Sequence, residues 1–378
     1  MSPDAKQELP ALSSLSGLIL TLTALSGELP TDQIMRLPST PAYRMKVLKS
    51  LKSDGLLRTY YRDGLRGVRL TKQAKRRMID CWPDLFCPVL AGNSATNAPK
   101  YTTPARLRLH RMAEVLVTML NAGVPVYPWE KPDLFSPMPL NEPPHFECPT
   151  YYSSRELKRI GKQASEISSS RAVGILLTNE EMSVVYNTGA GRMKWSARSE
   201  TRLVAMLQVD LCQARLPERF AGTKQNAILF GASMSQLPEL AVQDSKQCPS
   251  VFSQERDFPH IYFLPNDRHG EVILRLLNDP CEKAKLDDLL GHGLSDPRPD
   301  QAVENDAMDG DTPVMFGYTC DVPRIKSFSN LLGLQDRAGI LYCFDFQEDA
   351  LRQICGQGIK IQCLDFETVK ALLDDNAL

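Results

Sequence analysis

Four aspartates stand at positions where an α/β protein can hold a metal ion. Each follows a short apolar run that is typical of a strand and precedes a segment that is typical of a helix: Asp267, Asp321, Asp345 and Asp365. Because ligands of open α/β sheets bind at the carboxyl ends of strands, converging carboxylates there would bind Mg²⁺ and support phosphodiester hydrolysis. The simpler alternative is that each aspartate caps the following helix, and for any single one we favour capping.

Other catalytic signatures are missing from the sequence. It contains no GxxxxGK[ST] phosphate loop, no GxGxxG after a strand, no HxH and no CxxC. An acid followed by ExK, as in restriction-type nucleases, is approached only by Asp133 with Glu156 and Lys158, and the latter two lie on an expected helix. We therefore predict no cofactor and no metal site, and we lean against an enzyme.

The ten cysteines are scattered, and the five histidines have no zinc-finger spacing. Most cysteines lie in apolar runs such as "ILYCFDF", which favours small buried side chains over disulfides. This usage suits a reducing cytoplasm, where we expect the protein. The apolar segment 12–25 lacks the flanks of a signal peptide and is too short to span a bilayer, so we predict a buried helix and no membrane partner.

Positive charge is concentrated in one stretch of an otherwise acidic chain. The net charge is −1, yet residues 39–77 carry twelve Lys or Arg against Asp54 and Asp63. A local charge of this sign indicates a polyanionic partner for that stretch. The alternative is a solvated face that serves solubility or protein contacts.

The elements that must position these charges follow a recognisable order. Helices are expected at 12–25, 32–37 and 41–53, the last with Thr40 as N-cap, Pro41 at its first position and Gly55 at its end. Two extended runs then meet around Asp63 and Gly64, which predicts a hairpin, and Thr71 caps a basic helix.

This order, with the pattern "MKVLKSLKSDGLLRTYY…GVRLTKQAKR", resembles a winged helix-turn-helix domain. The resemblance implies that helix 41–53 enters the major groove of double-stranded DNA with the hairpin beside it. We expect Tyr43, Arg44 and Lys46 near the base edges and the remaining cations near phosphates: Lys49, Lys52, Arg58, Arg62, Arg66, Arg69 and Lys72.

The rest of the chain predicts a second domain of the α/β class. We expect a winged helix over 1–82, a linker over 83–149 with one long helix and a Pro-rich crossing, and an α/β domain over 150–378 with a mostly parallel or mixed sheet. Asn179 and Glu180 mark a hairpin turn, and an acidic stretch near 294–312 suggests a mobile loop. The segment "VVYNTGAGRMKWSARSE" is either a binding edge or a packing corner.

The element order, the "LLRTYY…VRLT" wing and the "RAVGILLTNEEMSVVYNTG" hairpin also resemble replication-relaxation-type proteins of bacterial plasmids and integrative elements. That resemblance implies a DNA-binding accessory of replication or transfer with a degenerate nuclease-like second domain. The leading expectation is a sequence-selective DNA-binding protein, a regulator or such an accessory. If it is a homodimer, we expect a palindromic site. A metal-dependent nuclease or nicking accessory that uses the strand-end aspartates, and a protein-interaction module without a DNA role, remain alternatives.

Overall fold

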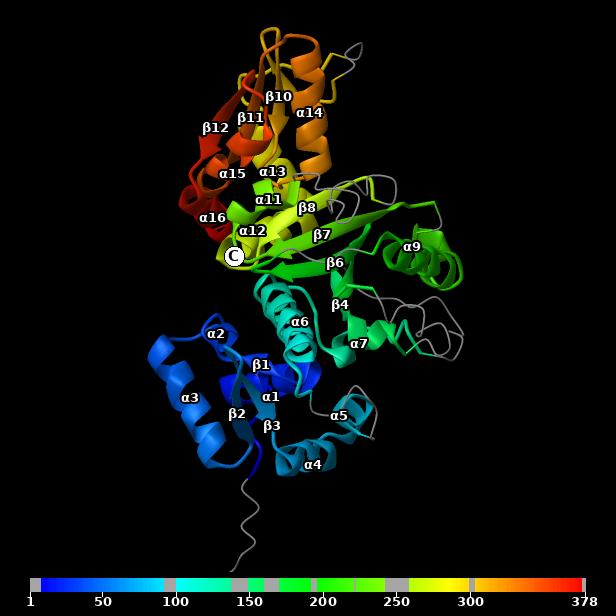
Figure 1. Cartoon of the computed structure of the whole chain (residues 1–378), viewed down its shortest axis with the longest axis vertical. Helices are drawn as coiled ribbons and strands as arrows, with labels where there is room; N and C mark the ends of the chain where they lie inside the picture. Colours follow the sequence, from blue (N-terminus) through cyan, green and yellow to red (C-terminus); the bar gives the residue numbers. More distant parts are fainter. Residues whose placement is uncertain are drawn as a thin grey trace, which may run out of the picture. The chain divides into compact units, whose positions relative to one another are not determined.

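The computed structural model describes residues 8–91, 100–136, 149–159, 170–191, 196–220, 222–241, 258–298 and 303–375. The chain forms two compact units (Figure 1). The first contains Met1–Asn121 and Pro125–Pro132, and the second contains Ala122–Val124 and Asp133–Leu378. The expected boundary at residue 82 therefore lies inside the first unit, and residues 83–149 are divided between the two units instead of forming a separate linker.

The first unit has the expected order of helices followed by a hairpin. Its elements are α1 (Leu15–Ser26), β1 (Leu29–Pro30), α2 (Thr31–Ile34), α3 (Pro41–Ser53), β2 (Leu57–Arg62), β3 (Leu65–Leu70), α4 (Lys72–Cys81), α5 (Pro83–Leu90), α6 (Thr103–Asn121) and a 3-10 turn at Pro128–Glu130. The three strands form an antiparallel sheet in the order β1-β3-β2.

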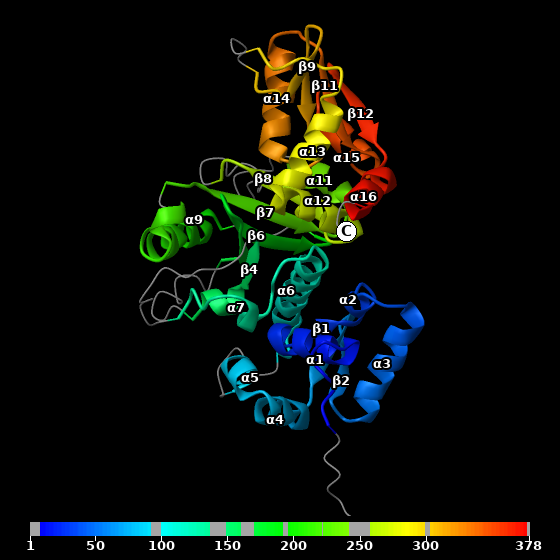
Figure 2. The same cartoon turned by 180° about the vertical axis from the view of Figure 1, so that it is seen from behind.

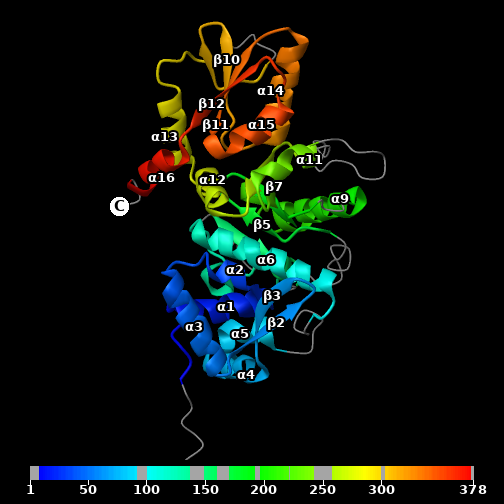
Figure 3. The same cartoon turned by 60° about the vertical axis from the view of Figure 1, so that its left-hand side comes forward.

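The core of the first unit lies between this small sheet and the helices. Ile19, Leu22, Leu48 and Val68 are buried there. The long helix α6 packs on α1 and on strands β1 and β3 (Figure 3). Its burial explains why the segment is apolar: it completes the first unit and does not merely connect two domains.

The second unit is of the α/β class and contains two mixed sheets. The first has the order β4-β5-β6-β7-β8. Its strands are β4 (Thr150–Ser153), β5 (Gly174–Leu177), β6 (Met182–Gly189), β7 (Gln225–Gly231) and β8 (Ile261–Pro265). Strands β4 to β6 are antiparallel neighbours, with the β5–β6 turn at Asn179 and Glu180 as expected, and β6 to β8 are parallel.

The second sheet has the order β12-β11-β10-β9 (Figure 2). Its strands are β9 (Ala307–Asp309), β10 (Thr312–Phe316), β11 (Gly339–Phe344) and β12 (Ile359–Leu364). Strands β10 to β12 are parallel, and β9 pairs antiparallel with β10. Within the described part of 294–312, the expected mobile loop therefore contains a strand and a hairpin turn; residues 299–302 lie outside the described residues.

Helices connect and flank the strands of the second unit. They are α7 (Ser154–Leu157), α9 (Ala197–Met206), a π-helical turn (Leu207–Gln213), α10 (Pro217–Phe220), α11 (Leu237–Ala241), α12 (Arg268–Asn278), α13 (Pro280–Leu290), α14 (Val322–Leu334), α15 (Glu348–Ile354) and α16 (Phe366–Asp375), with 3-10 turns at Met234–Gln236 and Asp345–Gln347. The two sheets meet where the Phe263 amide donates to the Cys320 carbonyl at 3.0 Å. We expected a mostly parallel or mixed sheet, and the sheets are mixed; their division into two was not predicted, because alternating strands and helices do not encode which strands pair.

Candidate nucleic-acid interface

Helix α3 presents lysines on the face opposite its core contacts. The Thr40 hydroxyl accepts from the Tyr43 amide at 3.3 Å, and Pro41 occupies the first helical position. Val47, Leu48 and Leu51 are buried, whereas Lys46 and Lys49 are exposed. Because residues three apart on a helix are neighbours, the two ammonium groups share one face.

Arg44 does not belong to that face, contrary to our expectation. It lies on the buried side of α3 with an exposed fraction of 8%. Its guanidinium donates to the Leu37 carbonyl at 2.9 Å and to the Met35 carbonyl. Arg44 therefore ties α3 to the end of α2, and we remove it from the set of DNA contacts.

Strands β2 and β3 form the wing, the hairpin of residues 57–70. Asp63 and Gly64 adopt left-handed φ angles of 51° and 77°, which suits a two-residue hairpin turn. Tyr61 lies opposite Arg66, and both side chains are exposed. Arg62, also exposed, completes a cationic and aromatic tip.

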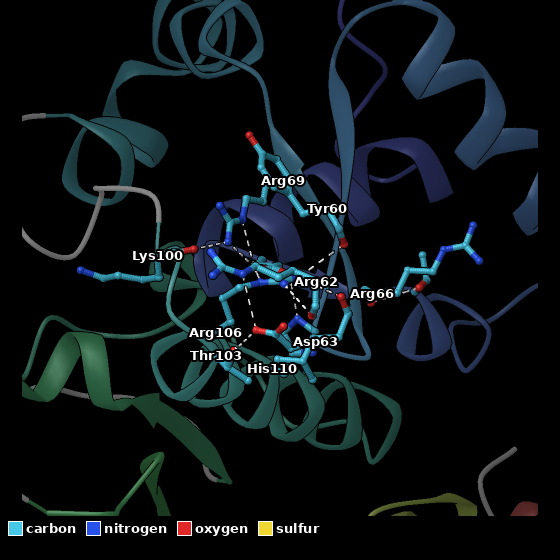
Figure 4. Close-up of polar contacts among 12 residues, drawn as sticks. Tyr60, Arg62, Asp63, Arg66, Arg69, Lys100, Thr103, Arg106 and His110 are labelled. Carbon is cyan, nitrogen blue, oxygen red and sulfur yellow. Dashed lines mark hydrogen bonds and ion pairs between the residues drawn. The ribbon is translucent and has the colours of Figure 1, made fainter.

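A buried cluster of charged side chains packs against the wing (Figure 4). The carboxylate of Glu28, between α1 and β1, accepts from Arg69 of β3 at 2.7 Å and from Arg106 of α6 at 2.5 Å. The Nε2 atom of His110, one turn after Arg106, lies 2.9 Å from the same carboxylate. All four side chains are buried. We call this set the Glu28 cluster.

The prediction for Arg69 was also wrong. We expected it at a phosphate, but the residue is only 6% exposed, and its guanidinium pairs with Glu28 and lies 4.2 Å from the centre of the Tyr60 ring. In Figure 4 the Arg66 side chain extends away from the cluster, whereas those of Arg69 and Arg106 point into it. Of these three side chains, only that of Arg66 is available to a ligand.

Arg106 links the cluster to the backbone of the wing. Its guanidinium donates to the carbonyls of Arg62 at 3.2 Å, Leu65 at 3.1 Å and Tyr60 at 3.4 Å. A Cβ atom at Gly67 would lie 2.6 Å from the Glu28 carboxylate, so only glycine fits there. The hairpin is thus fixed to α6 on both sides of its turn.

The charges of the first unit influence one another in two ways. Burial raises the pKa of Glu28, but hydrogen bonds from His110, Arg106 and Arg69 outweigh it and lower the pKa to about 2. The pKa of Lys52, at the end of α3, is lowered by partial burial and by the nearby Arg66 guanidinium. The second effect places the end of α3 and the wing within one region of positive potential.

The other expected contacts lie at the surface of the first unit. Those with exposed side chains are Tyr43, Lys46, Lys49, Arg58, Arg62, Arg66 and Lys72, and Lys52 is partly buried. Among the described residues, no carboxylate pairs with Lys46, Lys49, Arg58, Arg66 or Lys72. Arg62 has a 3.5 Å contact with Asp63, and both side chains are mostly exposed. Such a pair contributes little, so these cations remain available.

The sequence did not indicate Glu28, Arg106 or His110. Arg106 and His110 are four residues apart on α6, and that spacing on an apolar helix was a usable signal for a shared buried polar partner. Glu28 is separated from Arg106 by 78 residues and has no local signature.

The strand-end aspartates do not assemble a metal site. The Asp267 carboxylate accepts from the His269 amide at 2.8 Å, and the Asp365 carboxylate accepts from the Thr368 amide at 2.8 Å, so both cap helices. Asp345 accepts from the Phe346 amide at 2.8 Å. Over the described ranges, no group of three or more His, Cys, Asp or Glu side chains is arranged to hold a metal.

Asp321 differs from the other three. It occupies the N-cap of α14, but its side chain makes no cap hydrogen bond. Instead, the buried carboxylate lies 2.7 Å from Nδ1 of His260 and raises the pKa of that imidazole. The preceding residue, Cys320, has a φ of 56°, which is unusual for a residue other than glycine.

In two further segments that the sequence singled out, the described side chains make hydrogen bonds that hold the local fold. Tyr186 and Ser170 donate to the buried Glu200 carboxylate at 3.0 and 2.7 Å, which makes this region a packing corner; Lys194 and Trp195 lie outside the described residues. Glu156 forms a capping box with Ser153.

Comparisons with other proteins identify no relative. No protein-family model matches the chain, and neither the curated proteins nor the solved structures contain a significant match. In the part of the chain that the structure describes, no helix has the length and apolar character needed to cross a bilayer.

Proposed function

We propose that this chain binds double-stranded DNA through α3 and the wing. The observation that supports this most strongly is the set of exposed cations without carboxylate partners on both elements, among the described residues, combined with the lowering of the Lys52 pKa by burial and by the Arg66 guanidinium. A duplex is the polyanion whose major groove admits a helix and whose adjoining phosphates lie within reach of a hairpin beside it.

The proposed binding mode assigns different tasks to the two elements. Lys46 and Tyr43 on α3 approach base edges, and Lys49 and the wing arginines contact phosphates. The Glu28 cluster acts indirectly, by holding the wing in place. Because phosphate contacts supply most of the free energy, about six of them give a slope of about −5 in log K against log[salt]. We keep the role expected from sequence: selective binding by a regulator or by a replication or transfer accessory.

Fluorescence anisotropy of the full-length protein on labelled duplexes tests the proposal. One duplex carries the DNA that flanks the gene, and the other is an unrelated duplex of equal length. The variant Lys46→Ala with Lys49→Ala removes two surface charges from α3 and should reduce the magnitude of the salt slope by about 2. The matched control is Lys285→Ala with Lys360→Ala, two exposed lysines of the second unit, which should leave the slope unchanged.

Other results would favour the alternatives. An equal decrease of the salt slope in both double-lysine variants, or binding that does not respond to salt, would refute the DNA interface and favour a protein-interaction module. Nicking of supercoiled plasmid with Mg²⁺ that disappears in Asp345→Ala would instead favour a nuclease.

A further inference from the structure

Two cysteines of the second unit lie opposite each other on neighbouring strands. Cys343 of β11 and Cys363 of β12 are direct partners in the parallel register, and both are free thiols. Side chains of paired residues in parallel strands point to the same face, and neighbouring strands are about 4.8 Å apart. That spacing lies within the Cα–Cα range of disulfides, about 4.4–6.8 Å.

The two thiols and one carboxylate lie near one another. Burial and the Cys363 thiol raise the pKa of Cys343, and burial and the carboxylate of Glu348, at the start of α15, raise the pKa of Cys363. Glu348 is held in turn by Arg352. Both side chains therefore lie on one face of the sheet, at directly paired positions of neighbouring strands.

Exposure distinguishes the two cysteines. Cys343 is fully buried in the core, whereas Cys363 is exposed on β12, which is an edge strand of its sheet. A small oxidant in solution reaches Cys363 first, and the buried thiol is the nearest partner for the product.

We propose that Cys343 and Cys363 are a redox modification site, at which a hydroperoxide oxidises the two thiols to a reversible disulfide between them. Cys363 loses its proton, and its sulfur attacks the peroxide oxygen, which gives a sulfenic acid and, from hydrogen peroxide, water. The Cys343 sulfur then attacks the sulfenic sulfur, the S–S bond forms, and a second water leaves with the Cys343 proton. Overall, two thiols and one peroxide give one disulfide and two waters.

Glu348 sets how readily this reaction starts. Burial and the neighbouring carboxylate raise the pKa of Cys363, so little thiolate is present at neutral pH. The rate of oxidation should rise about tenfold per pH unit while the pH remains below that pKa. Removal of the negative charge in Glu348→Gln should speed the reaction severalfold at a given pH.

Closure of the disulfide would fasten an edge strand. β12 has a single described neighbour, β11, and α16 follows it directly. The covalent link joins β12 to the interior of its sheet. Because one sulfur is exposed, thiol reductants can reopen the bond.

The test is oxidation of the full-length protein by hydrogen peroxide, followed by peptide mapping with and without dithiothreitol. We expect loss of two hydrogens, a linked pair of peptides containing Cys343 and Cys363, and reversal by the reductant. Cys363→Ser should abolish the link. Cys281→Ser, which removes an exposed cysteine of α13, is the matched control and should not affect it.

Three results would overturn the proposal: a link between other cysteines, over-oxidation of Cys363 without any link, or an unchanged rate in Glu348→Gln. Because that variant keeps the size of the side chain and leaves both thiols in place, it tests the proposal without relying on a cysteine substitution in the core. None of these measurements depends on DNA binding.

Discussion

Substitution of Glu28 by glutamine should destabilise the first unit strongly. The carboxylate is fully buried and accepts from two guanidinium groups and an imidazole. Lowering of its pKa from 4.5 to about 2 corresponds to about 3 kcal/mol of folding free energy at neutral pH. Loss of one partner from a buried ion pair typically costs about 3–5 kcal/mol, so two independent arguments agree.

The pH dependence of this effect has a definite sign. Because the pKa is lower in the folded state, the contribution is complete above pH 4.5 and is lost as the pH falls toward 2. Glutamine resembles the protonated acid and has no such dependence. The stability difference between wild type and Glu28→Gln should therefore be about 3 kcal/mol at pH 7 and less than half of that at pH 3.

Urea denaturation of the full-length protein, followed by tryptophan fluorescence, measures this difference. Trp82 and Trp129, two of the three tryptophans, lie in the first unit and report its unfolding; Trp195 belongs to the second unit. Asp80→Asn removes an exposed carboxylate from the same unit and should change stability by less than about 0.5 kcal/mol. If Glu28→Gln lowers the free energy of unfolding by less than about 1 kcal/mol, or by the same amount at pH 7 and pH 3, the reasoning is refuted.

Further substitutions test other parts of the structure. Gly67→Ala places a methyl group against the buried carboxylate and should destabilise by about 1–3 kcal/mol, whereas Gly333→Ala in α14, where the added atom meets open space, should be neutral or stabilising; urea denaturation followed by far-UV circular dichroism, to which the helices of both units contribute, measures both variants. Arg44→Ala should lower stability by about 1–3 kcal/mol without changing the salt slope of DNA binding, and Lys46→Ala should do the reverse, as measured by urea denaturation and anisotropy together. The imidazole of His260 has a raised pKa, so its ion pair stabilises below pH 6.5 and is lost as the pH rises through the folded-state pKa; His260→Gln should therefore cost more stability at pH 5.5 than at pH 8.5.

Local signals in the sequence were sufficient for most elements. Thr40 with Pro41 predicted where α3 begins, Asp63 with Gly64 predicted the hairpin turn, and Thr71 predicted the start of α4, because caps and turns depend on neighbouring residues. The α/β class of the second unit followed from alternating strands and helices.

Contacts between distant parts of the chain could not be predicted in this way. The Glu28 cluster joins residues up to 82 positions apart, and the split of the second unit into two sheets depends on pairing choices that no local pattern records. Arg44 is a different case. Helical periodicity already places it on the same side as Val47, Leu48 and Leu51, so its burial was predictable and our emphasis on charge obscured it.

The contribution of α6 to the Glu28 cluster also sets an order in time for folding during synthesis. Ribosomes add about 5–20 residues per second, so Arg106 is made about 2–7 s after Arg69. During that interval Glu28 and the wing can approach each other, but the second guanidinium and the wing's attachment to α6 do not yet exist. A nascent chain that stalled, or a protein cleaved, between residues 82 and 103 would lack this partner, and its hairpin would be exposed to proteases. The first unit therefore completes its folding only when α6 has been made.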